Sequence, residues 1–329
     1  MKIAVIGPGR WGSFQAWYAS RICDNVVLYG REGSEKFEAL KKNRANEYLK
    51  LNDNIELSSD LAYTVDSAEY VIISVGAQRL RELAKELNSH KLDGKTLILC
   101  MKGIEKGSGK RLSEIINDEI TQDIDVAVWL GPGHVQEFVA EIPNCMVIDS
   151  ANPDVTEKVI NTFDSNLIRF YFGQDLIGTE IGGATKNIIG IAAGMLDGLG
   201  FSSLKGALMA RATREVGRYI ELMGGNPLSA YGLAHLGDYE ATLFSKHSHN
   251  RRFGEMFVKG EKMQKLAEGV DTLKAVRDKA KELSVPMPIT EALYNVIFDN
   301  MDIKEQFMGL FSRRIKPEFL SSKDYKKGE

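Results

Sequence analysis

Lys186 is the residue of this sequence whose setting most favours chemistry. It lies among small residues, at the start of a predicted helix that is apolar almost all round, where a lysine is rare. Burial and a nearby cation lower the pKa of a lysine toward neutrality, so that its amine can exchange a proton. When a hydride reduces a ketone, the carbonyl oxygen needs an acid, and the reverse reaction needs a base. Lys186 is therefore a candidate acid and base; the simpler interpretation is a side chain that extends to solvent or a charge at a helix N-terminus.

Two other charged residues could complete such a site. Lys102 follows a predicted strand, where a doubly wound sheet opens its ligand crevice. Asp238 follows a glycine-containing turn and could orient Lys186 through a charge-assisted hydrogen bond. Asn187 could orient a substrate through its amide. Each has a simpler interpretation: an exposed turn lysine, a helix-capping aspartate and a local cap by Asn187.

A glycine-rich loop at the N-terminus predicts the class of cofactor. Gly7, Gly9 and Gly12 form the pattern G-x-G-x-x-G between an apolar run and a predicted helix. In a dinucleotide-binding unit the first glycine permits a tight turn, the second lets the pyrophosphate approach, and the third lets the helix pack against the strand. The free N–H groups and positive dipole end of the helix then face the phosphates. A mere tight turn is the alternative interpretation.

The end of the second apolar run bears on the choice of cofactor. An acidic residue there would bind the ribose hydroxyls of NAD, and an arginine can bind the 2′-phosphate of NADP. Arg31 and Glu32 are both present, and Arg31 comes first. The sequence therefore favours NADPH or the use of both NADH and NADPH, with a solvated charged turn as the rival interpretation.

Short runs rich in valine and isoleucine alternate with amphipathic segments in the first half of the chain. We predict strands at Lys2–Ile6, Val26–Tyr29, Tyr70–Val75, Thr96–Met101, Val126–Leu130 and Cys145–Ile148. Gln78–Leu87 and Gly109–Ile120, between them, have helical spacing. This alternation predicts an α/β fold with a doubly wound Rossmann sheet.

Beyond about residue 180 the pattern becomes helical. The predicted helices are Ala184–Leu199, Ser203–Gly224, Met263–Leu283 and Pro288–Asp299. We therefore predict a dinucleotide-binding Rossmann domain over residues 1–178 and an all-helical substrate and catalytic domain over residues 179–329. The first long helix should be deeply buried, in part at a subunit contact. The excess of apolar helix surface in this second domain predicts a homodimer.

The composition excludes several classes of partner. The net charge is -3 and no long basic stretch occurs, which argues against nucleic acid. No apolar stretch approaches the roughly 20 residues that span a bilayer, so we expect no membrane insertion and a cytoplasmic protein. Cys23, Cys100 and Cys145 are read as buried thiols rather than a disulfide framework. His247 and His249 lack the spacing of a zinc motif, and we predict no metal site.

Segments along nearly the whole chain match the sequence elements of one enzyme family. They are Gly7–Ser13, Asn43–Leu49, Met101–Glu105, Gly131–Gly133, Gly178–Glu180, Gly183–Asn187, Ala192–Leu199, Gly232–Asp238, Ser248–Asn250 and Ala267–Gly269. In their order and content they resemble the NAD(P)-dependent glycerol-3-phosphate dehydrogenases of the bacterial and archaeal soluble type. So many matches in sequence order make chance an unsatisfactory explanation.

The resemblance implies an activity and a set of site residues. The activity is hydride transfer from NADH or NADPH to dihydroxyacetone phosphate, giving sn-glycerol 3-phosphate, a phospholipid precursor. By resemblance Lys186 is the proton donor and acceptor, Lys102 touches both cofactor and substrate, and Asp238 belongs to the substrate pocket. The implied substrate-binding residues are Lys102, Gly131, Gly133, Asn187, Ser248, His249 and Asn250. The implied cofactor-binding residues are Gly7, Gly9, Arg10, Trp11, Gly12, Arg31, Tyr48, Lys102, Val135, His249 and Glu268.

Three positions depart from the family pattern. His249 stands where the family has arginine, Gly133 where it has serine or threonine, and His235 where it has glycine. A neutral histidine offers one donor, whereas an arginine grips phosphate with a fork, and Arg251 or Arg252 could compensate. These departures leave room for a paralogue that reduces another ketone, of the ketopantoate reductase or opine dehydrogenase type. A non-catalytic NAD(P) sensor is the third hypothesis, against which the presence of Lys102 and Lys186 argues.

Overall fold

The computed structural model describes residues 1–66, 68–261, 267–315 and 318. One eight-stranded sheet has the order β3-β2-β1-β4-β5-β6-β7-β8. The strands are β1 (Ile3–Ile6), β2 (Val26–Tyr29), β3 (Ile55–Ser58), β4 (Tyr70–Ile73), β5 (Thr96–Leu99), β6 (Asp125–Leu130), β7 (Asn144–Ser150) and β8 (Ile168–Phe172). All neighbouring strands are parallel except β6 and β7. The carboxyl ends of β1, β4 and β5 therefore meet at one edge, where the glycine loop and Lys102 follow.

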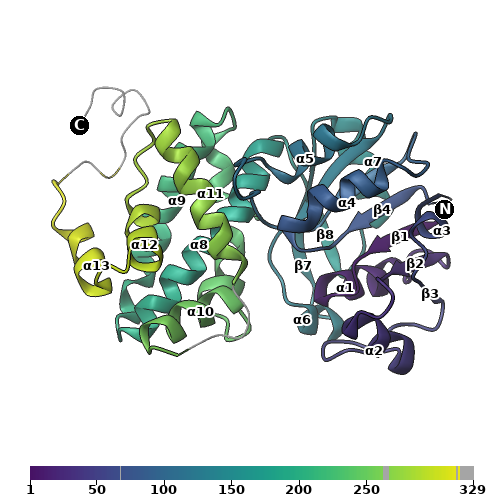
Figure 1. The fold of residues 1–329 in the computed structure, drawn as a ribbon, viewed down its shortest axis with the longest axis horizontal. Coiled ribbons are helices and arrows are strands. Elements are labelled where there is room, and N and C mark those ends of the chain that lie inside the picture. The colour runs from purple at the N-terminus through teal and green to yellow at the C-terminus, as the bar shows by residue number, and fades with distance from the viewer. Residues whose placement is uncertain (67, 262–266, 316–317, 319–329) are drawn as a thin grey trace.

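Helices cover both faces of the sheet, as the alternating pattern predicted (Figure 1). Ile3 and Val5 belong to the core with α1 (Arg10–Ala19), α6 (Val135–Val139) and α7 (Pro153–Phe163). Ala4 and Ile6 face the opposite core with α3 (Leu61–Asp66), α4 (Leu80–Leu87) and α5 (Leu112–Glu119). Because successive side chains of a strand point to opposite faces, a strand buried on both sides must be apolar throughout.

The sheet differs from the prediction at its two ends. Strand β7 runs antiparallel to β6, pairing Ala127 with Ser150, so the sheet is mostly but not wholly parallel. A short connection suffices for an antiparallel pair, and only α6 and its flanking loops join β6 to β7. Strands β3 and β8, which the sequence pattern did not reveal, are edge strands with exposed residues. Their apolar runs are therefore interrupted.

The second half of the chain is built around α8 (Leu176–Gly198), which is buried from Gly178 to Leu196. Around it pack α9 (Lys205–Leu222), α10 (His249–Val258) and α11 (Glu268–Glu282), followed by α12 (Pro288–Phe298) and α13 (Ile303–Phe311) (Figure 1). The predicted burial of α8 is confirmed. A Cβ at Gly194 would lie 1.8 Å from the carbonyl oxygen of Arg251, so this glycine permits the close crossing of α8 and α10.

Several predicted boundaries need correction. Helix α8 begins at Leu176, not Ala184, so Lys186 lies inside the helix rather than at its start. The proposed domain boundary at Gly178 falls in the first turn of α8, and the division at that point stays a prediction. Residues 263–266 of the predicted helix Met263–Leu283 lie outside the described residues. Its described part, α11, begins at Glu268.

The remaining global expectations concern membranes and cysteines. Across the described ranges, no helix combines the length and apolar character that a bilayer crossing requires. The three cysteines are free thiols, as expected, but each is only partly buried rather than fully buried.

Candidate active site

The glycine loop has the geometry that a dinucleotide requires. A Cβ at Gly12 would lie 1.8 Å from the carbonyl oxygen of Gly7, so only glycine lets α1 start this close to the turn. Gly7 itself has φ +115° and lies against Ser74 of the neighbouring strand end. A Cβ at Gly9, by contrast, would meet nothing within 4 Å. The loop is therefore closed on its protein side and open where a pyrophosphate would approach the helix N-terminus.

Arg10, at the first position of α1, ties the glycine loop to two other segments. Its guanidinium lies over the Tyr48 ring, 4.9 Å from the centroid. Its Nη2 donates to Gln136 Oε1 at 2.9 Å and lies 3.4 Å from Nδ1 of His134. Trp11 packs edge-on against Phe14 within the same helix. Three of the predicted cofactor-binding residues, Arg10, Trp11 and Tyr48, are thus gathered beside the glycine loop.

Two lysines, Lys186 buried and Lys102 partly buried, share one carboxylate oxygen. Asp238 Oδ2 accepts from Lys102 Nζ at 2.5 Å and from Lys186 Nζ at 2.8 Å. Lys102 also donates to the carbonyl oxygen of Gly131 at 2.9 Å, and Lys186 to Thr242 Oγ1 at 2.7 Å. The residues come from the end of β5, the middle of α8 and the turn Leu236–Asp238. The sequence predicted that Lys102, Lys186 and Asp238 act together, and the fold brings their charged atoms into contact.

The surroundings of Lys186 lower its pKa to about 8. Burial is the largest cause, because it disfavours the charged amine, and the positive charge of Lys102 adds to it. The Asp238 carboxylate opposes the shift but does not cancel it. An amine with such a pKa exchanges protons near neutral pH, which an ordinary lysine does not.

His235, one of the departures from the family pattern, lies beneath this cluster and is fully buried. Its Nδ1 lies 2.9 Å from the carbonyl oxygen of Gly182, to which it donates, and Nε2 lies 2.7 Å from the Tyr239 hydroxyl. Burial lowers its pKa to about 4, so the ring is neutral. His235 therefore holds the turn that contains Asp238 against α8.

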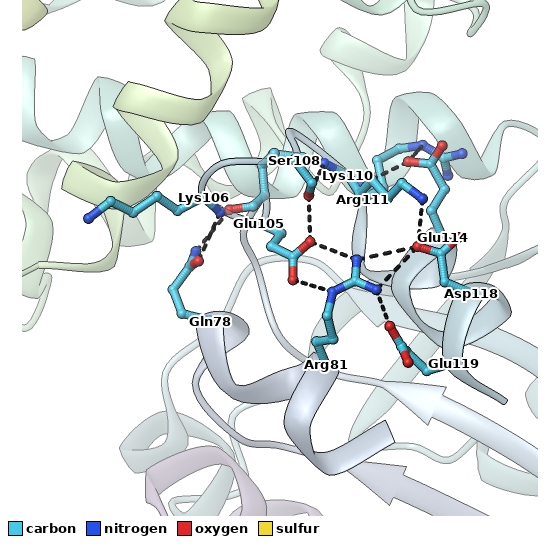
Figure 2. Close-up of polar contacts among 11 residues, drawn as sticks. Gln78, Arg81, Glu105, Lys106, Ser108, Lys110, Arg111, Glu114, Asp118 and Glu119 are labelled. Carbon is cyan, nitrogen blue, oxygen red and sulfur yellow. Dashed lines mark hydrogen bonds and ion pairs between the residues drawn. The ribbon is translucent and has the colours of Figure 1, made fainter. Parts of the chain in front are cut away.

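The turn that follows Lys102 is held by an ionic network (Figure 2). Arg81 on α4 grips Glu105 with two hydrogen bonds of 2.8 Å and also pairs with Asp118 and Glu119 on α5. Gln78 donates to the carbonyl oxygen of Ile104 at 2.9 Å. Because Arg81 presents a rigid fork to carboxylates of two segments, it fixes the backbone just beyond Lys102.

A buried carboxylate connects the sheet domain to the helix that carries Lys186. Glu180, on α8, accepts from Arg111 Nη1 at 2.6 Å, from the Ser113 backbone N–H at 2.9 Å and from the Ser113 hydroxyl at 2.6 Å. Burial raises the pKa of Glu180, and the arginine and serine partially oppose this shift. The contact sets α8 against the N-terminus of α5 and thereby sets Lys186 relative to the sheet.

The segment Ser248–Asn250, which the resemblance implies to bind substrate, mainly contacts neighbouring helices of the protein itself. The Ser248 hydroxyl caps α10 by accepting from the Arg251 N–H, and Asn250 Oδ1 accepts from the Gly269 N–H at 3.0 Å. Arg251, proposed to compensate for His249, pairs instead with Asp197 at 2.7 Å. Arg251 thus joins α10 to α8, and compensation for His249 by Arg251 or Arg252 stays a prediction. His249 is exposed at the first position of α10.

The other predicted residues have fewer contacts. Asn187 is buried next to Lys186, and Val135 is buried at the start of α6. Glu268 is the first residue of α11, and the positive charges of Lys186 and Lys102 act on its carboxylate. Arg31 is exposed in the turn after β2, so the structure leaves the choice between NADH and NADPH open.

Two polar residues of the site were missed. Thr242, which accepts from Lys186, lies in a single π-helical turn, Glu240–Phe244, that no sequence pattern indicated. His134 contacts Arg10 and faces His247 with ring centroids 5.6 Å apart. The sequence signal that could have identified His134 is its position directly after Gly133, one of the implied substrate-binding residues. Within the described ranges, no group of histidine, cysteine and acidic side chains has the arrangement of a metal site.

A Rossmann sheet with an open glycine loop and Lys102 after one of its strands, together with a buried lysine on a helical second half, defines a nicotinamide-dinucleotide-dependent dehydrogenase. Comparisons with known proteins identify the family. The N-terminal domain of NAD-dependent glycerol-3-phosphate dehydrogenase matches residues 2–156, and the C-terminal domain of that enzyme matches residues 175–308. The chain belongs to this family.

Individual relatives agree with the assignment. A glycerol-3-phosphate dehydrogenase [NAD(P)+] of Chlorobium luteolum is 36% identical over 97% of this chain and 99% of its own length. The crystal structure of glycerol-3-phosphate dehydrogenase from Coxiella burnetii superposes with a TM-score of 0.88 and 26% identity, covering 95% of this chain and 99% of that one. A ketopantoate reductase of Ralstonia eutropha has a TM-score of 0.62 at 14% identity, over 93% and 100%, and so shares only the fold.

Proposed function

We propose that this protein reduces dihydroxyacetone phosphate to sn-glycerol 3-phosphate with NADH or NADPH. The observation that carries the proposal is the oxygen of Asp238 shared by Lys102 and Lys186, in a chain of the glycerol-3-phosphate dehydrogenase family. Two cations beside one carboxylate leave one excess positive charge, which suits a phosphorylated ketone whose carbonyl oxygen becomes negative during reduction.

Lys186 acts as the general acid of the reduction. A reduced nicotinamide, when bound, would supply the hydride that the carbonyl carbon receives. The Lys186 ammonium gives its proton to the carbonyl oxygen, so that the ketone becomes an alcohol. In the reverse direction the neutral amine removes that proton. Its pKa of about 8 keeps both forms accessible near neutral pH.

Lys102 and Asp238 support this proton transfer in different ways. Lys102 lowers the pKa of Lys186 by repulsion and can also attract the substrate phosphate. Asp238 fixes the direction of the Lys186 amine. Thr242 accepts from the same amine and restricts it further. Gly7, Gly9 and Gly12 would hold the cofactor's pyrophosphate, since the backbone beside Gly9 is open.

The direct test is NAD(P)H oxidation followed at 340 nm with dihydroxyacetone phosphate, once with each cofactor. We expect turnover that is lost in Lys186→Met. Turnover with ketopantoate or a keto acid plus amine, but not with the triose phosphate, would favour the paralogue hypothesis. Binding of NAD(P)H without reduction of any of these ketones would favour the sensor hypothesis.

We also propose that the enzyme is a cytoplasmic homodimer. Support for self-association comes from exposed apolar residues on α13 and just beyond it, Met308, Phe311 and Ile315. Sedimentation equilibrium tests the stoichiometry. A monomer at micromolar concentration would contradict it.

A further inference from the structure

His134 has no assigned role in the chemistry above, yet its buried ring contacts Arg10 beside the glycine loop. It directly follows Gly133 after β6, and it is only 8% exposed. The positive charge of Arg10 and, more weakly, the negative charge of Asp238 act on its ring. Its Nδ1 lies 3.4 Å from Arg10 Nη2, so His134 lies next to the helix that follows the glycine loop.

The contacts of His134 define which ring nitrogen carries hydrogen. Burial and then the charge of Arg10 lower its pKa, with Glu137 and Asp238 opposing and His247 adding to the shift, so the ring is neutral at pH 7. Nδ1 lies 3.4 Å from Arg10 Nη2. A guanidinium can only donate, so Nδ1 is the acceptor and the single N–H is on Nε2.

That N–H has no acceptor. Nε2 of His134 is buried and has no hydrogen-bond partner among the described residues. A buried donor without a partner costs free energy, so such groups in native proteins generally have an acceptor in the working state. An oxygen of a bound ligand would supply such an acceptor.

The neighbouring residues indicate which ligand. Gly133 has φ +133°, and a Cβ there would lie 2.4 Å from the Phe138 ring, so the hydroxyl that the family pattern has at this position cannot be accommodated. Facing His134 is the ring of His247, which belongs to the segment just before α10. The hydroxyl donor of the family pattern is therefore missing at Gly133. The next residue, His134, has a ring N–H without a hydrogen-bond partner among the described residues.

We infer that His134 Nε2–H donates to the phosphate of the substrate, replacing the hydroxyl that Gly133 lacks, while His247 packs against the imidazole. This inference rests on the proposed function for the identity of the substrate. The cofactor's pyrophosphate is the other source of phosphate oxygens near Arg10, and the experiment separates the two.

Two substitutions form a matched pair. His134→Asn keeps an acceptor near Nδ1 but has no donor at Nε2, whereas His134→Gln places an amide N–H near Nε2. We expect His134→Asn to raise KM for dihydroxyacetone phosphate roughly 10- to 100-fold, the effect of losing a hydrogen bond to a charged group. His134→Gln should stay within about threefold of the parent.

Three readouts separate a phosphate contact from other roles. The kcat and the Kd for NADH, measured by fluorescence, should stay within about threefold in both variants. The kcat/KM for dihydroxyacetone, which lacks the phosphate, should be the same in His134→Asn and the parent. An unchanged KM overturns the inference, a rise only in the Kd for NADH assigns the donor to the cofactor, and equal losses in both variants assign His134 to packing alone.

Failure of the proposed function would be distinguishable. If the parent protein does not reduce dihydroxyacetone phosphate, inorganic phosphate is titrated calorimetrically into the NADH-loaded protein. Phosphate binding that weakens about tenfold or more in His134→Asn but not in His134→Gln keeps the phosphate site. Absence of phosphate binding, or equal binding by all three proteins, overturns it.

Discussion

Two clusters beside α8 share the same composition, one aspartate and two cations, but differ in what surrounds them. Asp238 pairs with Lys102 and Lys186, and Asp197 pairs with Lys205 at 2.6 Å and with Arg251 at 2.7 Å. Both clusters are largely shielded from water. Only the first lies at the carboxyl edge of the sheet, next to the glycine loop.

The Asp197 cluster joins helices to one another. Its residues come from α8, α10 and the start of α9, and Lys205 also donates to the carbonyl oxygen of Leu243 at 2.9 Å. Ser202 donates to the second oxygen of Asp197 at 2.6 Å, so both carboxylate oxygens are used. The Asp197 cluster is therefore a set of mutually paired side chains that holds α8, α9 and α10 together.

The Asp238 cluster instead contains a group that can titrate. Lys186 has a pKa of about 8, and its partners come from three separate segments. The comparison teaches that a buried Asp with two cations is not by itself a catalytic sign. What distinguishes the reactive cluster is a cation whose proton can leave, placed beside a cofactor loop.

The largest expected effect is on catalysis. Lys186→Met should lower kcat by about 10²- to 10⁴-fold, because the general acid is removed. Its Tm should be no lower than that of the parent, since the folded-state pKa lies below the unfolded value and the protonated amine therefore disfavours folding below pH 8. Steady-state kinetics and thermal unfolding, measured on one preparation, test both statements. A folded Lys186→Met enzyme with full turnover would remove Lys186 from the mechanism.

The second prediction concerns the Asp197 cluster. Asp197→Ala should lower the free energy of unfolding by about 3–5 kcal/mol, because two buried cations lose their shared anion. The enzyme that remains folded should keep kcat within a few-fold of the parent. Denaturant titration with an activity assay measures both, and Glu157→Ala, at an exposed position of α7, is the control. Unchanged stability would show that this cluster does not hold the helices together.

The third prediction concerns the turn beyond Lys102. Arg81→Gln should lower kcat/KM by about tenfold, because the backbone that positions Lys102 loses its clamp. The control is Arg79→Gln, since Arg79 precedes the same helix and pairs only with the exposed Glu82 among the described residues. If both variants kept parental kcat/KM, the network in Figure 2 would have no part in positioning the lysine.

Much of this architecture could be predicted from the sequence where one physical signal dominates. Strands β1, β4 and β5 are buried on both faces, so their apolar runs are continuous. Strands β3 and β8 were not predicted, because an edge strand such as Ile168–Phe172 has only some of its side chains buried and therefore lacks a continuous apolar run. The antiparallel direction of β7 could not be predicted from the amino-acid composition of that strand.

The site was predictable in part for a similar reason. A lysine among glycine, alanine and isoleucine is visible in any sequence, as is a glycine loop between a strand and a helix. The contact of His134 with Arg10 joins residues 124 positions apart, and the Lys186–Thr242 hydrogen bond joins residues 56 apart. Such pairs depend on how two helices cross, which no local pattern encodes. The ion pair of Arg251 with Asp197, 54 positions apart, was not predicted for the same reason.

The pH dependence of kcat for ketone reduction tests the central claim most directly. Because reduction needs the protonated Lys186, kcat should be constant below its pKa and fall as pH rises through about 8, while kcat for alcohol oxidation should rise over the same interval. Lys102→Gln should move this transition to higher pH, since the repulsion that lowers the pKa of Lys186 is removed. A rate without any transition between pH 7 and 9, or the same transition in Lys186→Met, would contradict the account.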